Sequence, residues 1–250
     1  MLGDENRLVG DLAGLQAAFD RALPLVWMAF QPIIRRRGSE VYGYEALVRS
    51  TEPNLPHPGA LFDAAERLKR LPELGQVIRR LVAEVIPAAP TGRWILVNLH
   101  PEDLLDDDLY DPAAPLSGHA SRVVLEITER AALDGIGDVR GRIAKLRALG
   151  YRVAVDDLGS GYAGLNSFAL LEPEVVKLDM VLVRDVDQAP TKQKVILSMI
   201  SLCRDLGMEV ICEGVETAAE RDVLLSLGAD LLQGFYFARP AKGFPTAREA

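Results

Sequence analysis

Acidic side chains recur where apolar, strand-like segments of this sequence end. In YEALVRS, Glu45 stands in an apolar run, and a carboxylate is costly to bury there unless a positive charge meets it. Similar segments end near Glu126, Asp156, Asp157 and Glu213. Carboxylates that converge on one pocket repel one another and raise each other's pKa values. Divalent cations relieve this repulsion, and carboxylates with the amide of Asn98 suit Mg²⁺ or Mn²⁺.

Zinc is not indicated, because the histidines and cysteines lack the spacing of zinc ligands. The chain has His57, His100 and His119, and two cysteines, Cys203 and Cys212. We expect both cysteines to be reduced and buried, although one disulfide between them is an alternative.

The acids must be positioned by strands that alternate with helices. Strand patterns cover Val26–Ile34, Val41–Val48, Arg93–Leu99, Arg122–Ile127, Tyr151–Val155, Val175–Leu178, Met208–Cys212 and Leu231–Phe237. Helical patterns cover Gly59–Val85, Val139–Leu149, Thr191–Leu206 and Thr217–Leu227. About eight strands in this order predict an α/β fold, a TIM-like (β/α)8 barrel, whose active sites lie at the carboxyl ends of the strands. A doubly wound open sheet is less favoured, because no glycine-rich phosphate loop follows the first strand.

The amino-terminal part predicts two departures from a regular barrel. The turn RRRGSE joins the first two strands as a hairpin, so one strand near the N-terminus is expected to be antiparallel. Residues 1–24 are expected to form a leading helix or the remainder of a linker, and residues 25–250 the barrel domain. Leu12, Leu15, Phe19 and Leu23 share one face of that helix.

Composition excludes several classes of protein. The chain has 250 residues, of which 49% are hydrophobic and 26% charged, as in globular proteins. Its net charge of −8 argues against binding a DNA or RNA polymer. No apolar run reaches the roughly 20 residues that span a bilayer, and the acidic N-terminus is unlike a signal peptide, so a cytoplasmic location is expected.

Several motifs in order resemble one family. They are FQPI (30–33), EALVR (45–49), VNLHP (97–101), LEITE (125–129), DDLGSGYAGL (156–165), VKLD (176–179), CEGVET (212–217) and QGFYFARP (233–240). Together they resemble the EAL-domain cyclic di-GMP phosphodiesterases over nearly the whole chain. The resemblance implies a TIM-like barrel with one antiparallel strand and a metal-dependent hydrolysis of cyclic di-GMP to linear pGpG.

The resemblance also implies roles for individual residues. One metal would be bound by Glu45, Asn98, Glu126 and Asp156, and a second by Asp156 and Asp157, with Glu213 supporting a metal through water. Lys177 would orient the attacking water or accept its proton. Gln31 and Arg49 match substrate contacts, and Gln233 lies at the pocket wall. Glu129 matches the anchor of the loop that carries Asp157, and Glu216 a residue behind the metal site. Asp157 reaches its metal only if the strand breaks there, because consecutive strand residues point to opposite faces.

Other interpretations of these residues stay open. Arg49 could pair with Glu45 in an inert salt bridge, Lys177 could be a solvated residue at a strand end, and Glu129 and Glu216 could be ordinary surface acids. The chain also departs from the family pattern at Ser50–Asn54, at Leu158 and at Cys212. The first departure concerns a loop near the substrate entrance.

Two further functions compete with the phosphodiesterase. One is a catalytically silent cyclic di-GMP-binding or partner-docking module, and the other is an unrelated metal-dependent barrel hydrolase. The resemblance further implies a homodimer, for which Val195, Met199 and Cys203 of the helix Thr191–Leu206 offer a face, unless that face packs on the barrel. Regulation is expected from a domain outside these 250 residues.

Overall fold

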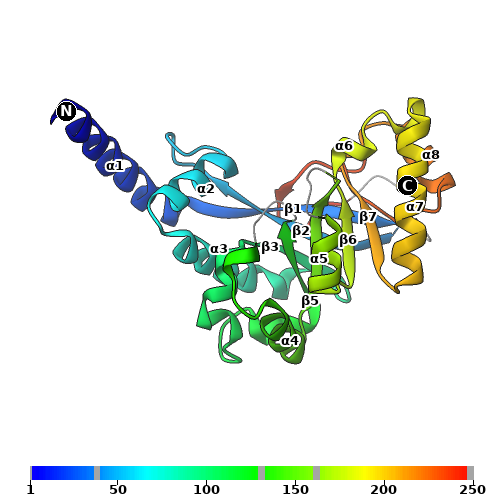
Figure 1. The fold of residues 1–250 in the computed structure, drawn as a ribbon, viewed down its shortest axis with the longest axis horizontal. Helices are drawn as coiled ribbons and strands as arrows, with labels where there is room; N and C mark the ends of the chain where they lie inside the picture. The colour runs from blue at the N-terminus through cyan, green and yellow to red at the C-terminus, as the bar shows by residue number, and fades with distance from the viewer. Residues whose placement is uncertain (1, 37–39, 129–132, 160–163, 247–250) are drawn as a thin grey trace.

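The computed structural model of the chain describes residues 2–36, 40–128, 133–159 and 164–246. In that part of the chain, eight strands close a barrel, and a ninth pairs with β1 outside the ring (Figure 1). The strands are β1 Val26–Arg35, β2 Glu40–Ser50, β3 Trp94–Leu99, β4 Val123–Thr128, β5 Arg152–Leu158, β6 Val175–Leu178, β7 Glu209–Cys212, β8 Leu231–Leu232 and β9 Ala241–Lys242. The predicted TIM-like barrel is confirmed, and the alternative of an open sheet is wrong.

Strand β1 closes the ring and runs antiparallel to both of its neighbours. It pairs with β2, with Val26 opposite Ser50 and Gln31 opposite Glu45, and with β8. The remaining neighbours in the ring pair in parallel. The predicted hairpin is therefore confirmed. Because β1 runs the opposite way, its first residue lies at the barrel end where the parallel strands finish.

The helices pack outside the barrel. They are α1 Leu2–Ala22, α2 Pro58–Arg67, α3 Leu71–Val85, α4 Val139–Leu149, α5 Gly164–Leu171, α6 Met180–Val183, α7 Pro190–Asp205 and α8 Ala218–Ser226. The predicted helix over Gly59–Val85 is divided in two, because Lys69 has a left-handed φ of 56°. Pro72 then stands in the first turn of α3, where a missing N–H costs no helical hydrogen bond.

The predicted strand Leu231–Phe237 is correct only for its first two residues. After Leu232 the chain turns, and the amides of Phe237 and Ala238 both donate to the Gly234 carbonyl. The Gln233 N–H still donates to the Cys212 carbonyl, but beyond it these local bonds replace ladder pairing, so Gly234–Phe237 form a tight turn.

The barrel interior is filled from one end by an apolar layer. Its buried members are Ile33, Tyr42, Leu96, Val124, Ala154, Val175, Ile211 and Leu231. The larger core lies between the barrel wall and the helices, with residues such as Phe19, Phe30 and Leu74 fully buried. Alternation of side chains along a strand separates the two cores.

Helix α1 is docked through its last two turns. Phe19 is fully buried, Leu15 and Leu23 are partly buried, and Leu12 is 40% exposed, so the predicted apolar face contacts the barrel domain only toward its carboxyl end. Arg21 Nη2 lies 2.8 Å from Glu52 Oε1 in the loop after β2. Figure 1 shows the amino-terminal part of α1 extending away from the barrel.

Helix α7 buries Ile196, Ile200 and Cys203, whereas its Val195 is 41% exposed. Cys203 and Cys212 are free and fully buried, as expected, and burial raises the pKa of the Cys203 thiol to about 11. Cys203 is thus unavailable to the dimer face suggested for α7, which corrects that part of the prediction. Among the described helices, none has the length and hydropathy to cross a membrane.

Candidate active site

A layer of polar side chains lies directly above the apolar floor of the barrel. In β2 the polar residue, Glu45, follows Tyr42 by three positions, because the pairing with β1 shifts between Ile33 and Ile34. In β3 to β8 each inward-facing apolar residue is followed, two residues nearer the carboxyl-end face, by a polar one. The pairs are Leu96 and Asn98, Val124 and Glu126, Ala154 and Asp156, Val175 and Lys177, Ile211 and Glu213, and Leu231 and Gln233. In antiparallel β1 the order is reversed, with Gln31 two residues before Ile33. The period of two along each strand therefore brings the predicted residues together.

Lys177 lies at the centre of this layer and is 1% exposed. Its Nζ lies 2.7 Å from Glu213 Oε1, 2.8 Å from Glu126 Oε1, 3.0 Å from Asp156 Oδ1 and 3.3 Å from Glu45 Oε1. The alternative that Lys177 is a solvated residue at a strand end is therefore wrong.

The charges of this layer perturb one another strongly. Burial, together with repulsion from Glu45 and Asp156, holds the pKa of Glu126 well above its ordinary value, although Lys177 opposes this. Burial and the same kind of repulsion raise the pKa of Glu213 to about 8. Burial alone would lower the pKa of Lys177, but the surrounding carboxylates outweigh it and raise that pKa. One ammonium does not balance four carboxylates, so the layer is short of positive charge.

The acids form two overlapping groups with the spacing of metal ligands. Carboxylate oxygens of Glu45, Glu126 and Asp156 lie within 4.8 Å of one another, as do those of Asp156, Asp157 and Glu213. Asp156 belongs to both groups, which is the arrangement expected of a bridging ligand.

Asp157 joins the second group because β5 is irregular there. The pairing of β5 with β6 shifts between Val155 and Leu158, and Asp157 has a left-handed φ of 57°. This β-bulge lets two consecutive residues face the same side, which regular strand geometry forbids. The predicted break is confirmed, with Gly159 following at a φ of 107°; Gly161 lies outside the described residues.

The donor set suits a hard divalent cation. Both carboxylate oxygens of Glu126 and Oδ1 of Asp156 are buried, and among the described residues they accept no hydrogen bond. Lys177 Nζ lies 2.8 Å from Glu126 Oε1 and 3.0 Å from Asp156 Oδ1 and is an ionic partner for these two oxygens, whereas Glu126 Oε2 faces no donor in the described part of the chain. Buried carboxylate oxygens without donors are costly, and an oxygen-binding cation such as Mg²⁺ or Mn²⁺ would satisfy them.

Amide side chains orient Glu45 from both sides. Gln233 Nε2 donates to Glu45 Oε2 at 2.6 Å and to Gln31 Oε1 at 3.1 Å, and Gln31 Nε2 donates to the Ala238 carbonyl. Asn98 Nδ2 lies 3.3 Å from Glu45 Oε1, which leaves the amide oxygen of Asn98 for another partner.

A cavity of about 340 Å³ opens above the polar layer. Its lining includes most of the predicted site residues, namely Gln31, Glu45, Arg49, Asp156, Asp157, Lys177, Glu213, Glu216 and Gln233. Arg49 Nη1 donates to the carbonyl of Val48, and within the described residues the ion-pair partner of Glu45 is Lys177. The inert Arg49–Glu45 salt bridge is therefore not formed.

Glu216 lies at the cavity wall in a bidentate pair with Arg184, with Nη2 2.7 Å from Oε1. Hydrogen bonding to Arg184 lowers the pKa of Glu216. Behind it, the buried carboxylate of Glu220 accepts hydrogen bonds from the amides of Asp185, Glu216 and Thr217, which fixes the loop after β7. Glu216 is thus an exposed acid paired with Arg184 at the cavity wall, and it is not a member of the two carboxylate groups.

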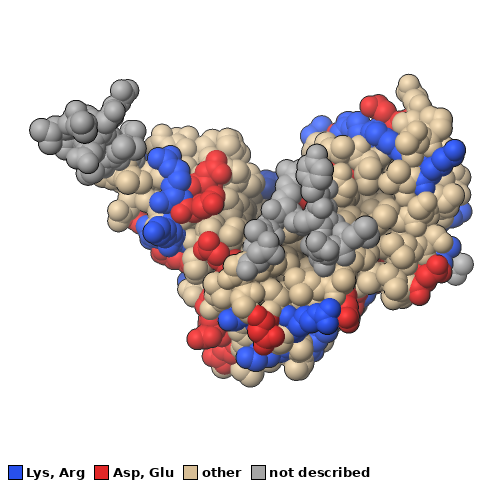
Figure 2. Space-filling view, in the orientation of Figure 1, with Lys and Arg blue, Asp and Glu red and all other residues tan. Residues whose placement is uncertain are grey.

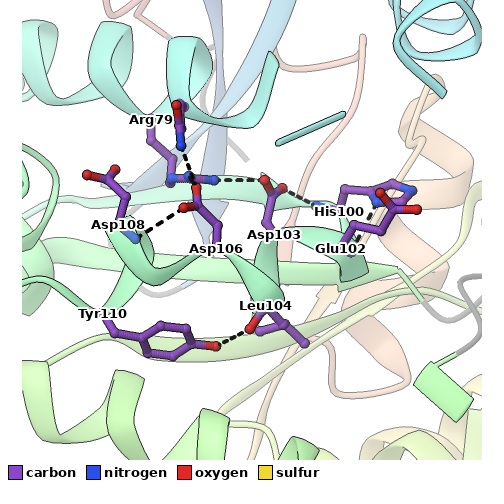
Figure 3. Close-up of polar contacts among 9 residues, drawn as sticks. Arg79, His100, Glu102, Asp103, Leu104, Asp106, Asp108 and Tyr110 are labelled. Atoms are coloured by element: carbon purple, nitrogen blue, oxygen red, sulfur yellow. Dashed lines mark hydrogen bonds and ion pairs between the residues drawn. The ribbon is translucent and has the colours of Figure 1, made fainter. Parts of the chain in front are cut away.

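The loop after Asn98 is fixed by a buried arginine (Figure 3). Arg79 on α3 is 4% exposed, pairs with Asp106, and places Nη1 2.9 Å from Asp103 Oδ1. Asp103 Oδ2 in turn accepts the backbone N–H of His100, two residues after Asn98. The end of β3 is therefore tied to α3.

The sequence did not predict several of the residues that line the cavity, and one predicted site residue lies outside the described residues. Arg184, Met180 and Phe235 line the cavity but were not predicted, because none of them follows an apolar strand in the pattern that marks the acids. The predicted loop anchor Glu129 lies outside the described residues.

Known proteins are similar to this chain in sequence and in fold. Residues 15–240 match the EAL domain. Cyclic di-GMP phosphodiesterase PdeR of Escherichia coli is 32% identical over 84% of this chain and 33% of its own length. The chain spans about a third of the first curated relatives it matches, 37% and 34% of their lengths.

Solved structures agree with this family. Klebsiella pneumoniae BlrP1, in a complex with calcium and cyclic di-GMP, has a TM-score of 0.77 and 31% identity, covering 90% of this chain and 59% of that chain. A standalone EAL protein from Vibrio cholerae, bound to cyclic di-GMP, has a TM-score of 0.71 and 29% identity, covering 89% of this chain and 95% of that chain. This chain belongs to the EAL domain family.

Proposed function

We propose that the chain is a metal-dependent phosphodiesterase that hydrolyses cyclic di-GMP to linear pGpG. The observation that carries the proposal is the pair of carboxylate groups that share Asp156, around a buried lysine and beneath an open cavity. The relative named as a cyclic di-GMP phosphodiesterase and the neighbour bound to calcium and cyclic di-GMP support the same substrate.

The residues of the polar layer suit two divalent cations, Mg²⁺ or Mn²⁺. Glu45, Asn98, Glu126 and Asp156 would bind one of them, and Asp156 and Asp157 the other, with Glu213, the third member of the second group, supporting a metal through water. Bound there, two cations would neutralise the substrate phosphate and lower the pKa of a bound water.

The remaining residues bind and orient. Lys177 is fixed by the four carboxylates around its Nζ, and we assign to it the placement of the attacking water. Arg49 at the cavity wall would bind a substrate phosphate, because its guanidinium is not paired with Glu45. Gln233 holds the Glu45 carboxylate and also donates to Gln31, and both amide side chains would contact the substrate from the same side.

Turnover of cyclic di-GMP in the presence of Mg²⁺ or Mn²⁺ tests the proposal. We expect pGpG from the wild type, loss of turnover on chelation, and a loss of about 10²–10⁴-fold in kcat for Lys177→Met. Glu45→Ala should lose both turnover and Mn²⁺ affinity while keeping the thermal unfolding transition of a folded barrel.

A silent binding module makes the opposite prediction. It would bind cyclic di-GMP by calorimetry but yield no pGpG at micromolar protein with either metal, and that result would refute the enzyme. The homodimer, the cytoplasmic location and a regulatory domain outside these residues belong to the same proposal; light scattering tests the first of them.

A further inference from the structure

Two adjoining hollows open at the end of the barrel opposite the catalytic cavity. Strand β1 finishes there with Arg35, and β7 and β8 begin there with Glu209 and Leu231. The smaller hollow has a volume of about 180 Å³ and the more open one about 690 Å³. We call them the floor hollows, and the residues that line both are Arg35, Arg204, Gly228, Ala229 and Asp230. None of the described residues that line them also lines the catalytic cavity, so they are a separate candidate site.

Both carboxylates among the described lining residues already have cationic partners. Asp230 Oδ2 lies 2.7 Å from Arg35 Nη1. Glu209 lies 2.9 Å from Arg35 Nη2 and 2.9 Å from Arg152 Nη2, and the Tyr42 hydroxyl donates to it as well. These contacts neutralise the two acids without using any other arginine of the floor hollows.

Arg36 and Arg204 converge on the same connection between α8 and β8. Arg36 Nη1 donates to the Leu225 carbonyl at 2.8 Å, and Arg204 Nη2 lies 3.4 Å from the Gly228 carbonyl oxygen. A Cβ on Gly228 would lie 3.2 Å from Arg204 Nη2, so the missing side chain admits the guanidinium. Both arginines are exposed, and within the described residues neither forms an ion pair with a carboxylate. A guanidinium has five N–H donors, so each arginine keeps several of them for another partner.

The floor hollows therefore have an excess of positive charge, although the chain as a whole has a net charge of −8. Capping of the end of α8 accounts for one N–H of each arginine, but not for two unneutralised guanidinium groups beside one concave wall. Planar guanidinium groups match the oxygens of a phosphate in pairs. The smaller hollow adds apolar surface, because Ile200 and Val210 are buried there and Met208 is partly exposed.

We propose that the floor hollows bind a phosphate-bearing small molecule through Arg36 and Arg204. The chemistry recognised is the phosphate group, which an inorganic phosphate and a nucleotide share. In a nucleotide, the base would lie in the smaller hollow against Ile200 and Met208. This binding requires neither divalent cations nor hydrolysis in the catalytic cavity, so it goes beyond the proposed function and does not depend on it.

Titration calorimetry in EDTA at constant ionic strength tests the site with two probes, pyrophosphate and GTP. We expect saturable binding of both to the wild type. Arg36→Gln and Arg204→Gln should each weaken binding about 10–100-fold, the usual effect of losing hydrogen bonds to a charged group, with an unchanged thermal unfolding transition. Equal affinity for the two probes would show that the phosphate groups alone are recognised, whereas tighter binding of GTP would add the base to the recognised group.

Arg140→Gln is the matched control, because Arg140 is exposed, also donates to a backbone carbonyl near a helix end, that of Ala169, and lines neither floor hollow. Arg49→Gln reports on the catalytic cavity, which Arg49 lines. The proposal is overturned if neither probe binds at millimolar concentration, or if Arg36→Gln and Arg204→Gln bind as the wild type does. It is also overturned if Arg140→Gln weakens binding equally, or if Arg49→Gln abolishes it. None of these outcomes bears on turnover of cyclic di-GMP, so the two proposals fail separately.

Discussion

The charge balance of single residues determines how this site responds to pH. Glu213 and Glu126 have raised pKa values in the folded protein, because burial and neighbouring carboxylates oppose their ionisation. In the unfolded chain both groups return to the ordinary glutamate pKa of about 4.3. At pH values between the unfolded and the folded pKa of these glutamates, the folded protein therefore binds more protons than the unfolded chain.

Stability without divalent cations should consequently fall as pH rises from about 5 to 8. The free energy of unfolding decreases wherever the folded state binds more protons, by up to about 1.4 kcal/mol per pH unit for each proton. Urea unfolding in EDTA at several pH values measures this slope. Saturating Mg²⁺ should flatten it, because cations replace the protons.

Glu213→Gln supplies the sharper comparison. Removing this titration, which runs to about pH 8, should reduce the slope in EDTA, whereas Glu66→Gln on the exposed side of α2 should not. A slope unchanged by Glu213→Gln would contradict the assignment of the titration to that residue.

At the residue scale, much of the site could be predicted from sequence. Glu126, Asp156 and Glu213 each follow an inward-facing apolar strand residue by two positions, so one register places them, whereas Glu45 follows Tyr42 by three because the pairing of β1 with β2 is irregular. The Arg184–Glu216 pair could not be predicted, because its partners are 32 residues apart on different loops. The left-handed backbone of Asp157 was only implied by the need for adjacent acids to face one side.

At the scale of elements, helix α3 holds the segment that follows β3 through Arg79 and Asp103. Arg79 and Asp103 are both nearly fully buried, and a side chain at Gly75 would collide with Asp103. Burial raises the pKa of Asp103 although Arg79 opposes this, so the carboxylate depends on its partner. Contacts between a helix and a loop 24 residues later leave no periodic signal in the sequence, and this one was not predicted.

Arg79→Met should therefore destabilise the fold by about 3–5 kcal/mol, since it leaves a buried carboxylate unpaired. It should also weaken Mn²⁺ binding several-fold, measured by calorimetry, because the backbone at His100 loses its anchor and Asn98 lies two residues away. Restoring neutrality with Asp103→Asn in the same chain should recover part of the stability.

Arg147→Met is the matched control. Arg147 on α4 also pairs with an acid in a following loop, Glu174, at 2.7 Å, but it is half-buried and lies at the opposite end of the barrel. We expect a loss of under about 1 kcal/mol and unchanged Mn²⁺ affinity. If Arg79→Met destabilised the protein but left Mn²⁺ affinity intact, its network would be structural only.

At the scale of the whole molecule, the closing seam of the barrel is thin. Strands β1 and β8 share only two residue pairs, Ile34 with Leu232 and Arg35 with Leu231. Glu209 at the start of β7 supports this seam by accepting hydrogen bonds from Arg35 and Tyr42 and pairing with Arg152. Elsewhere the charges are dispersed, and Figure 2 shows acidic and basic side chains interspersed on the face in view.

Glu209→Ala should lower the free energy of unfolding by about 1–3 kcal/mol, because Tyr42 and Arg152 lose their carboxylate partner and Arg35 keeps only Asp230. Turnover at saturating metal should stay near that of wild type, since Glu209 lies at the end of the barrel away from the cavity. Glu40→Ala, which removes a more exposed partner of Arg93 at 3.4 Å, should cost under about 0.5 kcal/mol by urea unfolding. Equal effects of the two variants would show that the seam gains nothing from Glu209.

The reversed direction of β1 has one more consequence. Because Val26 pairs with Ser50, helix α1 joins the barrel at the end where the parallel strands finish and the cavity opens, and not at the apolar floor. Arg21 of this helix forms an ion pair with Glu52, which lies three residues after Arg49. Glu52 belongs to Ser50–Asn54, the segment that departs from the family pattern. A displacement of this helix would therefore be transmitted through the Arg21–Glu52 ion pair to the segment that follows Arg49 at the cavity wall.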